Sequence, residues 1–195
     1  MAEKIKDYRI GAPPTWGSWV PREAAGHVDA VAEKVATGEA AQARVREAVL
    51  LFDATVPVDT APLTAAVWVP EPSTGEIYGF LFADLLRGET GAALSAEVFL
   101  QRVKKAPRER GVKLFDHSTS AAEVEAGPAV IEMRRWAEKG SGQVLSSVAW
   151  TIFAPGASEA VRLEFTTPVA QVFDALTDES VVIANTVRLE LGEPV

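Results

Sequence analysis

The sequence predicts an α+β fold in which a mostly antiparallel β-sheet of about six to seven strands is packed by helices. Two observations indicate this class. Four β-like segments follow one another after residue 111, separated by short Gly, Pro and Ser clusters, as expected of an antiparallel meander. Segments with helical periodicity are grouped before and after these strands, which disfavours a doubly wound parallel sheet.

Length and composition predict a single domain over residues 1–195. The chain has 195 residues, of which 48% are hydrophobic, enough for one contiguous core. The sequence shows no internal repeat, low-complexity tract or interdomain linker.

The first part of the chain predicts a short strand, a loop and two helices. Side chains alternate between apolar and polar near the N-terminus, which is typical of a strand. The following Pro- and Gly-rich stretch contains Trp16 and Trp19 and predicts a rigid loop. Apolar residues at helical spacing then predict helices over about 22–37 and 39–55.

The middle of the chain predicts a hairpin followed by a helix. Residues 63–69 and 76–86 form the two arms around the turn sequence PEPSTG. The second arm is almost continuously apolar, as in a strand covered on both faces. A short helix is the alternative for this arm. Ser95 then supplies an N-cap for a helix that Pro107 ends.

The C-terminal half predicts the meander and a closing helix. In its last strand Val161 and Leu163 face one way and Arg162 faces the other, so one face is buried and one is wetter. A helix follows Pro168, and the final residues form either its last turn or an extra strand. The four predicted strands are 112–118, 129–139, 144–154 and 160–167.

Charge and composition limit the classes of function. The formal net charge is -8, which argues against nucleic acid because phosphate binding relies on clustered Lys and Arg. The chain has no cysteine, which removes disulfides, thiolate nucleophiles and iron-sulfur clusters. The charged N-terminus lacks an apolar leader and no apolar run is long enough to span a membrane. The expectation is a cytoplasmic protein without membrane insertion.

The residues that could carry metal or catalytic chemistry are few. The only histidines, His27 and His117, lie on different predicted elements, so no metal site is expected. Asp116, His117 and Ser118 have the residue types of a hydrolase triad, but neighbours in a strand face opposite ways, and DHSTS is interpreted as a loop. Carboxylate pairs such as Glu132 with Asp116 are expected by chance in an acidic chain. No phosphate-binding loop occurs, and no cofactor is expected.

Two groups of residues are candidates for binding a partner. The basic group with Arg102, Lys104 and Lys105 is either a solvated helix end or a contact for an acidic partner. Trp16 and Trp19 either attach their loop to the core or form an exposed binding patch, since Trp is enriched at interfaces.

Two stretches, PPTWGSWVP and the end AVRLEFTTPVAQVFDALTDESVVIANTVRLEL, resemble the Mog/PsbP-like α/β/α sandwich family. They are also similar to small uncharacterised actinobacterial proteins with a terminal strand, a Ser/Thr-Pro step and a helix containing FDA. The two helical patterns before the hairpin depart from the family order. The resemblance implies a non-enzymatic scaffold that binds proteins as an adaptor, assembly factor or secretion chaperone, with no catalytic residue to carry over.

The sequence therefore leaves three hypotheses about function. The first is a non-enzymatic intracellular module that binds another protein, as an adaptor, chaperone or immunity-like partner. The second is a small-molecule-binding protein or enzyme with a pocket between sheet and helices. The third is a structural subunit whose strand edges near Thr151 or Arg162 pair with a neighbour. The expected pocket lining is Phe80, Phe82, Trp136 and Trp150.

Overall fold

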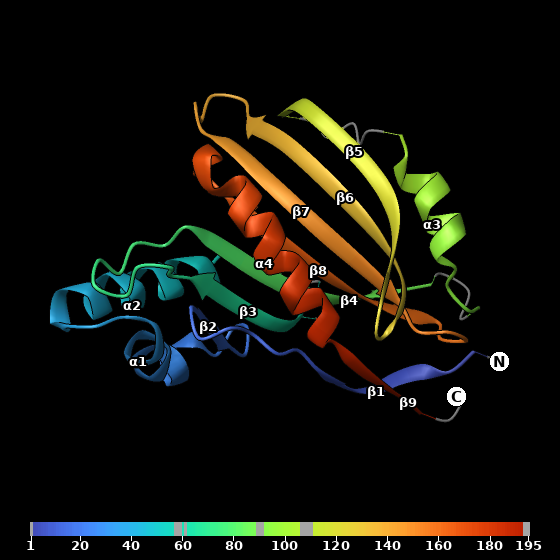
Figure 1. The fold of residues 1–195 in the computed structure, drawn as a ribbon, viewed down its shortest axis with the longest axis horizontal. Coiled ribbons are helices and arrows are strands. Elements are labelled where there is room, and N and C mark those ends of the chain that lie inside the picture. The colour runs from blue at the N-terminus through green and yellow to red at the C-terminus, as the bar shows by residue number, and fades with distance from the viewer. Residues whose placement is uncertain (1, 57–59, 61, 89–91, 106–110, 193–195) are drawn as a thin grey trace. The chain divides into compact units, whose positions relative to one another are not determined.

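A computed structural model describes residues 2–56, 60, 62–88, 92–105 and 111–192. These residues form four α-helices, one short 3-10 helix and nine strands (Figure 1). The strands pair mostly in antiparallel fashion. The predicted α+β class with a mostly antiparallel sheet is confirmed.

The chain divides into two compact units. One is Ala12–Asp84, and the other consists of Met1–Gly11 together with Leu85–Val195. The boundary falls within strand β4 (Gly79–Arg87). The expectation of one domain over 1–195 stays a prediction.

The Ala12–Asp84 unit packs two helices on a short antiparallel sheet. Strand β2 pairs with β3, and β3 pairs with β4. The helices pack on this sheet through apolar side chains that include Val31, Val45 and Val67. The elements that precede β4 are β2 (Trp16–Trp19), α1 (Ala24–Val35), α2 (Glu39–Asp53) and β3 (Pro62–Trp68).

The stretch around Trp16 and Trp19 was expected to be a loop, and the structure shows a strand instead. Trp16 lies opposite Trp68 of β3, and Trp19 lies opposite Ala65. The strand forms because β3 offers an edge to pair with, which the local Pro and Gly content does not reveal.

Asp53, the last residue of α2, ties this strand to α1. Its Oδ1 accepts hydrogen bonds from Trp19 Nε1 (2.8 Å) and from the backbone N–H of Arg22 (2.7 Å). Its Oδ2 accepts from the N–H of Ala24 (3.3 Å), where α1 begins. A carboxylate at this helix start satisfies N–H groups that have no partner within the helix.

The second unit contains the predicted meander. Strands β5, β6, β7 and β8 pair in sequence order, each antiparallel to the next. The prediction of four sequential strands is confirmed. Their bounds are β5 (Val112–Val124), β6 (Gly127–Glu138), β7 (Val144–Phe153) and β8 (Glu159–Thr167).

The expectation that DHSTS forms a loop is wrong. His117 pairs with Arg134 and Ser118 pairs with Met133, so the segment lies within β5. Long-range pairing with β6 supplies the backbone hydrogen bonds that Asp, Ser and Thr side chains offer locally in a loop.

Helices cover both faces of the β5–β8 sheet. Trp150 of β7 donates from Nε1 to Ser180 Oγ of α4 (Phe173–Thr186) at 3.0 Å. Phe153, three residues further along β7, faces the other way and meets Phe99 of α3 (Ala96–Val103), with ring centroids 5.5 Å apart. Figure 1 shows α4 lying across the sheet and α3 beside β5. This unit is therefore layered as helix, sheet and helix.

The two ends of the described chain pair with each other. Strand β1 (Lys4–Arg9) runs antiparallel to β9 (Arg188–Gly192). Helix α4 follows the 3-10 turn η1 (Ala170–Val172) and runs through Asp178 without interruption. Among the described helices, none combines the length and apolar character needed to span a membrane.

Candidate ligand-binding site

Helix α3 forms for the reasons that the sequence indicated, but it is only half-buried. Ser95 Oγ accepts from the N–H of Val98 at 3.5 Å. None of the eight residues of α3 is fully buried, so the helix rests on the sheet without being enclosed by it. Its apolar stripe packs against Val130, Phe153 and Ala160. The members of that stripe are Ala96, Phe99, Leu100 and Val103.

The segment before α3 is attached to the turn between β7 and β8. The N–H of Gly88 donates to the carbonyl of Ser158 (3.0 Å), and the N–H of Leu94 donates to the carbonyl of Ala157 (2.8 Å). These bonds hold the start of the helix, and its apolar side chains contact the sheet.

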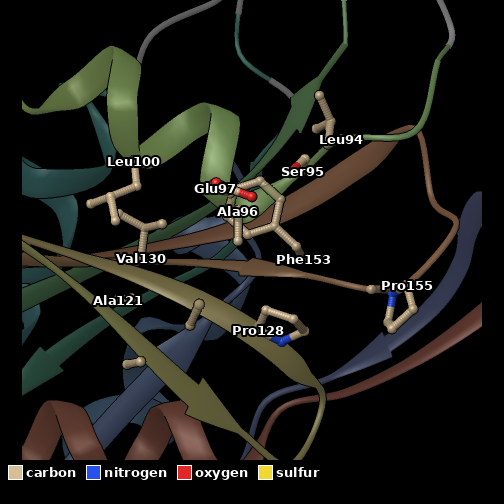
Figure 2. Close-up of a pocket in the computed structure, with 13 residues that line it drawn as sticks. Leu94, Ser95, Ala96, Glu97, Leu100, Ala121, Pro128, Val130, Phe153 and Pro155 are labelled. Atoms are coloured by element: carbon tan, nitrogen blue, oxygen red, sulfur yellow. The ribbon is translucent and has the colours of Figure 1, made fainter.

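A pocket of about 510 Å³ opens on one side of α3, and we call it the apolar pocket. Figure 2 shows Leu100 pointing from α3 toward Val130, with the Phe153 ring beside Ala96. Its described lining is apolar except for Ser95 and Glu97. The lining residues are Leu94, Ser95, Ala96, Glu97, Leu100, Ala121, Ala122, Pro128, Ala129, Val130, Phe153, Ala154 and Pro155.

The hairpin turn between β5 and β6 borders this pocket through Pro128. Gly127 has φ +137°, and a Cβ at this position would collide with the carbonyl oxygen of Phe153. Glycine is therefore required at this position for two reasons, its backbone conformation and the close approach of β7.

A second pocket of about 560 Å³ lies on the other side of α3, and we call it the arginine pocket. Leu94 and Phe153 line both pockets, so the two are neighbours. Arginines reach the second one from three elements: Arg87 from β4, Arg102 from α3 and Arg162 from β8. The rest of its described lining is Leu86, Gly88, Leu94, Phe99, Val103 and Phe153.

A row of charged side chains continues from Arg162 across the same sheet face. Arg162 Nη2 donates to Glu164 Oε2 (3.2 Å), and Arg134 Nη2 donates to Glu164 Oε1 (2.6 Å). Arg134 also lies 3.6 Å from Glu132 Oε1, which meets His117 Nε2 at 3.3 Å. Burial alone would raise the pKa of Glu164, but the charges of Arg162 and Arg134 and their hydrogen bonds outweigh it and lower that pKa below its ordinary value.

The structure brings one of the basic candidates into a site and leaves the other two outside. Arg102 lines the arginine pocket with Arg87 and Arg162. Lys104 and Lys105 are exposed just beyond the end of α3. The rest of the basic sequence, residues 106–110, lies outside the described residues.

Trp16 and Trp19 do not form the exposed patch that was one of their two interpretations. They are 0% and 4% exposed, respectively. The Trp16 ring stacks on Trp68 at a centroid distance of 6.0 Å, and Trp19 is held by Asp53. Both rings are buried, Trp16 against Trp68 and Trp19 in the core of the Ala12–Asp84 unit, so they attach this segment to its unit.

Asp116, His117 and Ser118 are not assembled into a triad. Asp116 and Ser118 line a small hollow of about 170 Å³ that also involves Phe173 at the start of α4. His117 points to the other face, where it meets Glu132. Alternation along β5 thus separates the three side chains, as neighbouring strand residues require.

A pocket between sheet and helix exists in the described structure, but not with the lining expected from the sequence. Trp150 lies on the α4 face with Ser180, whereas Trp136 alternates onto the opposite face. Phe80 packs against Phe52 in the Ala12–Asp84 unit, with ring centroids 4.6 Å apart. Phe82 is half-buried on β4.

The sequence contained signals for the pocket that was found. The helical spacing of Phe99, Leu100 and Val103 marks one apolar face of α3, and the alternation in β8 marks Arg162 as facing away from the packed side. Ala121 carried no signal, because its role depends on the register that places it opposite Val130.

The fold and the site define an α+β protein with an apolar pocket beside a half-buried helix. No protein-family model and no curated protein matches the chain. Among solved structures, LpqN, described as involved in cell envelope biogenesis of Mycobacterium tuberculosis, aligns with 94% of this chain and 90% of its own at 15% identity and a TM-score of 0.44. A likeness at this level supports no inference about fold or function.

Proposed function

We propose that the protein is a non-catalytic binding protein for a small molecule with an apolar chain, held in the apolar pocket beside α3. The observation that carries this proposal is the pocket itself, about 510 Å³ with a lining that is apolar apart from Ser95 and Glu97 among the described residues. Pockets for small molecules typically measure about 300–1,000 Å³ and are mostly apolar.

The position of α3 supports entry of a ligand. The helix has no fully buried residue, and its contacts with the sheet are made by a single apolar stripe. Segments with few buried contacts open at low cost in free energy. A chain inserted beside α3 would cover apolar atoms of Leu94, Leu100 and Ala121, which line the pocket and are not fully buried.

Filling the pocket at Ala121 tests the proposal. Ala121 is exposed on β5 and lines the apolar pocket, so A121F places a ring in the pocket without entering the core. Phe is also well suited to a strand. Calorimetric titration with decanol should show affinity for the wild type and a loss of about tenfold or more in A121F, which equals about 1.4 kcal/mol or more.

The matched control is S120F. Ser120 is the exposed neighbour on the same strand, and its side chain faces the other way. S120F should bind decanol like the wild type. Equal weakening in both variants, or no binding of decanol by the wild type, would contradict the proposal.

A second candidate function is association with another protein through the edge of β5. Thr151 was expected at a strand edge, but β7 pairs with both β6 and β8, so it lies on an interior strand, and Arg162 pairs with it. Strand β5 instead ends the sheet, pairing with β6 alone among the described strands. A 13-residue edge can accept a further strand, and we take that strand to be β5 of a second copy.

The cytoplasmic location expected from the sequence is likewise a proposal. Fractionation of cells that express the protein tests it, since recovery with the cell envelope would contradict it.

A further inference from the structure

The arginine pocket combines positive charge with apolar surface in an otherwise acidic chain. The net charge of the protein is -8, yet Arg87, Arg102 and Arg162 line one hollow of about 560 Å³. Its described lining holds no carboxylate, and Leu86, Phe99 and Val103 supply its apolar part.

The three guanidinium groups differ in what they already bind. Arg87 Nε donates to Glu159 Oε1 at 3.2 Å, and Arg162 Nη2 donates to Glu164 Oε2 at 3.2 Å. Arg102 makes no hydrogen bond or ion pair with any described residue. Arg102 lines the pocket beside two further arginines, each of which is already paired with a glutamate.

Such a group recognises an anion. A guanidinium presents several N–H donors in one plane and binds a carboxylate or phosphate through two parallel hydrogen bonds.

We propose that the arginine pocket holds the anionic head of an amphiphile whose chain lies in the apolar pocket. This inference rests on the proposed function and adds the ligand class, a free long-chain carboxylate. Leu94 and Phe153 line both pockets, so the two adjoin, and in this proposal one molecule occupies both. The head is bound by Arg102, with Arg87 and Arg162 adding charge.

The test compares three probes with the same chain and different heads: decanoate, decanol and decyltrimethylammonium. In titration calorimetry with the full chain, decanoate should bind most tightly, decanol less tightly and decyltrimethylammonium least tightly. In R102Q, the affinity for decanoate should fall about tenfold, and the affinity for decanol should stay within about twofold. R102K, which keeps the charge, should recover part of the loss.

The control is K104Q, which removes one charge near the same end of α3 from a residue outside the pocket lining. It should leave decanoate binding within about twofold of the wild type. An equal loss in K104Q and R102Q would overturn the inference, because it would show a general effect of charge. Equal binding of decanol and decanoate would overturn the inference and leave the proposed function standing, whereas no binding of any probe would overturn both.

The source of the anion is tested with vesicles that contain an acidic phospholipid. A pocket for a free amphiphile predicts that the protein does not sediment with the vesicles at physiological salt. Sedimentation with the vesicles, without affinity for decanoate, would overturn the inference in favour of a membrane surface.

Discussion

Burial and neighbouring charges act in opposite directions on the pKa of Glu164. Its carboxylate bonds Arg134 at 2.6 Å and Arg162 at 3.2 Å, and those two partners hold its pKa below the ordinary value of 4.5 despite burial. Because the folded-state pKa is lowered, the stabilisation is present above the ordinary value and is lost as pH falls through the folded-state pKa.

The variant E164Q should lower the free energy of unfolding at neutral pH by about 1–3 kcal/mol, because two guanidinium groups lose a charged partner. Urea unfolding at a series of pH values below 4.5 provides the measurement. Wild-type stability should fall more steeply with decreasing pH than that of E164Q. Parallel curves would show that Glu164 does not contribute to the acid sensitivity.

The sequence predicted which face of the sheet the β8 residues occupy, but it did not predict which charged side chains pair with them. Alternation in β8 placed Val161 and Leu163 in the core and Arg162 on the wetter face, and the structure agrees. The bond from Arg134 to Glu164 joins β6 to β8 across β7. It depends on the register of two strand pairs, and sequence periodicity carries no information about register.

At the scale of elements, the edge of β5 tests the second candidate function. In an antiparallel strand, the N–H groups of adjacent residues point to opposite edges. Of the two variants S118P and T119P, one therefore removes an N–H that points outward and the other removes an N–H that bonds β6. Proline is tolerated at a free edge and disrupts a ladder. Sedimentation velocity should show self-association of the wild type, lost in whichever proline variant keeps the wild-type melting temperature. A wild type that stays monomeric at high concentration would contradict strand addition between copies.

Elements with strong local signals were predictable, and those that depend on distant pairing were not. The Ser95 cap and the apolar spacing of α3 lie within one short segment, and the helix begins where they indicate. Strand β2 was expected to be a loop because its Pro and Gly content is local, while its partner β3 comes after both helices. The pairing of β1 with β9 joins opposite ends of the chain.

At the scale of the whole molecule, the second unit carries the proposed site. Its two helices cover opposite faces of one antiparallel sheet, with Ser180 of α4 bonded to Trp150 on one face and α3 leaving two pockets open on the other. The meander and the closing helix could be predicted from spacing. The pockets could not, because they arise from how incompletely α3 covers the sheet, which depends on side-chain packing between elements.

The measurement that tests the central claim most directly is a map of ligand-induced changes in the amide NMR spectrum. Decanol added to the full chain should shift the amide signals of residues 94–103 of the α3 segment, together with those of Ala121, Val130 and Phe153. Signals from α4 and from the Ala12–Asp84 unit should stay in place. Changes centred on α4, or an unchanged spectrum up to saturation with decanol, would contradict a ligand site beside α3.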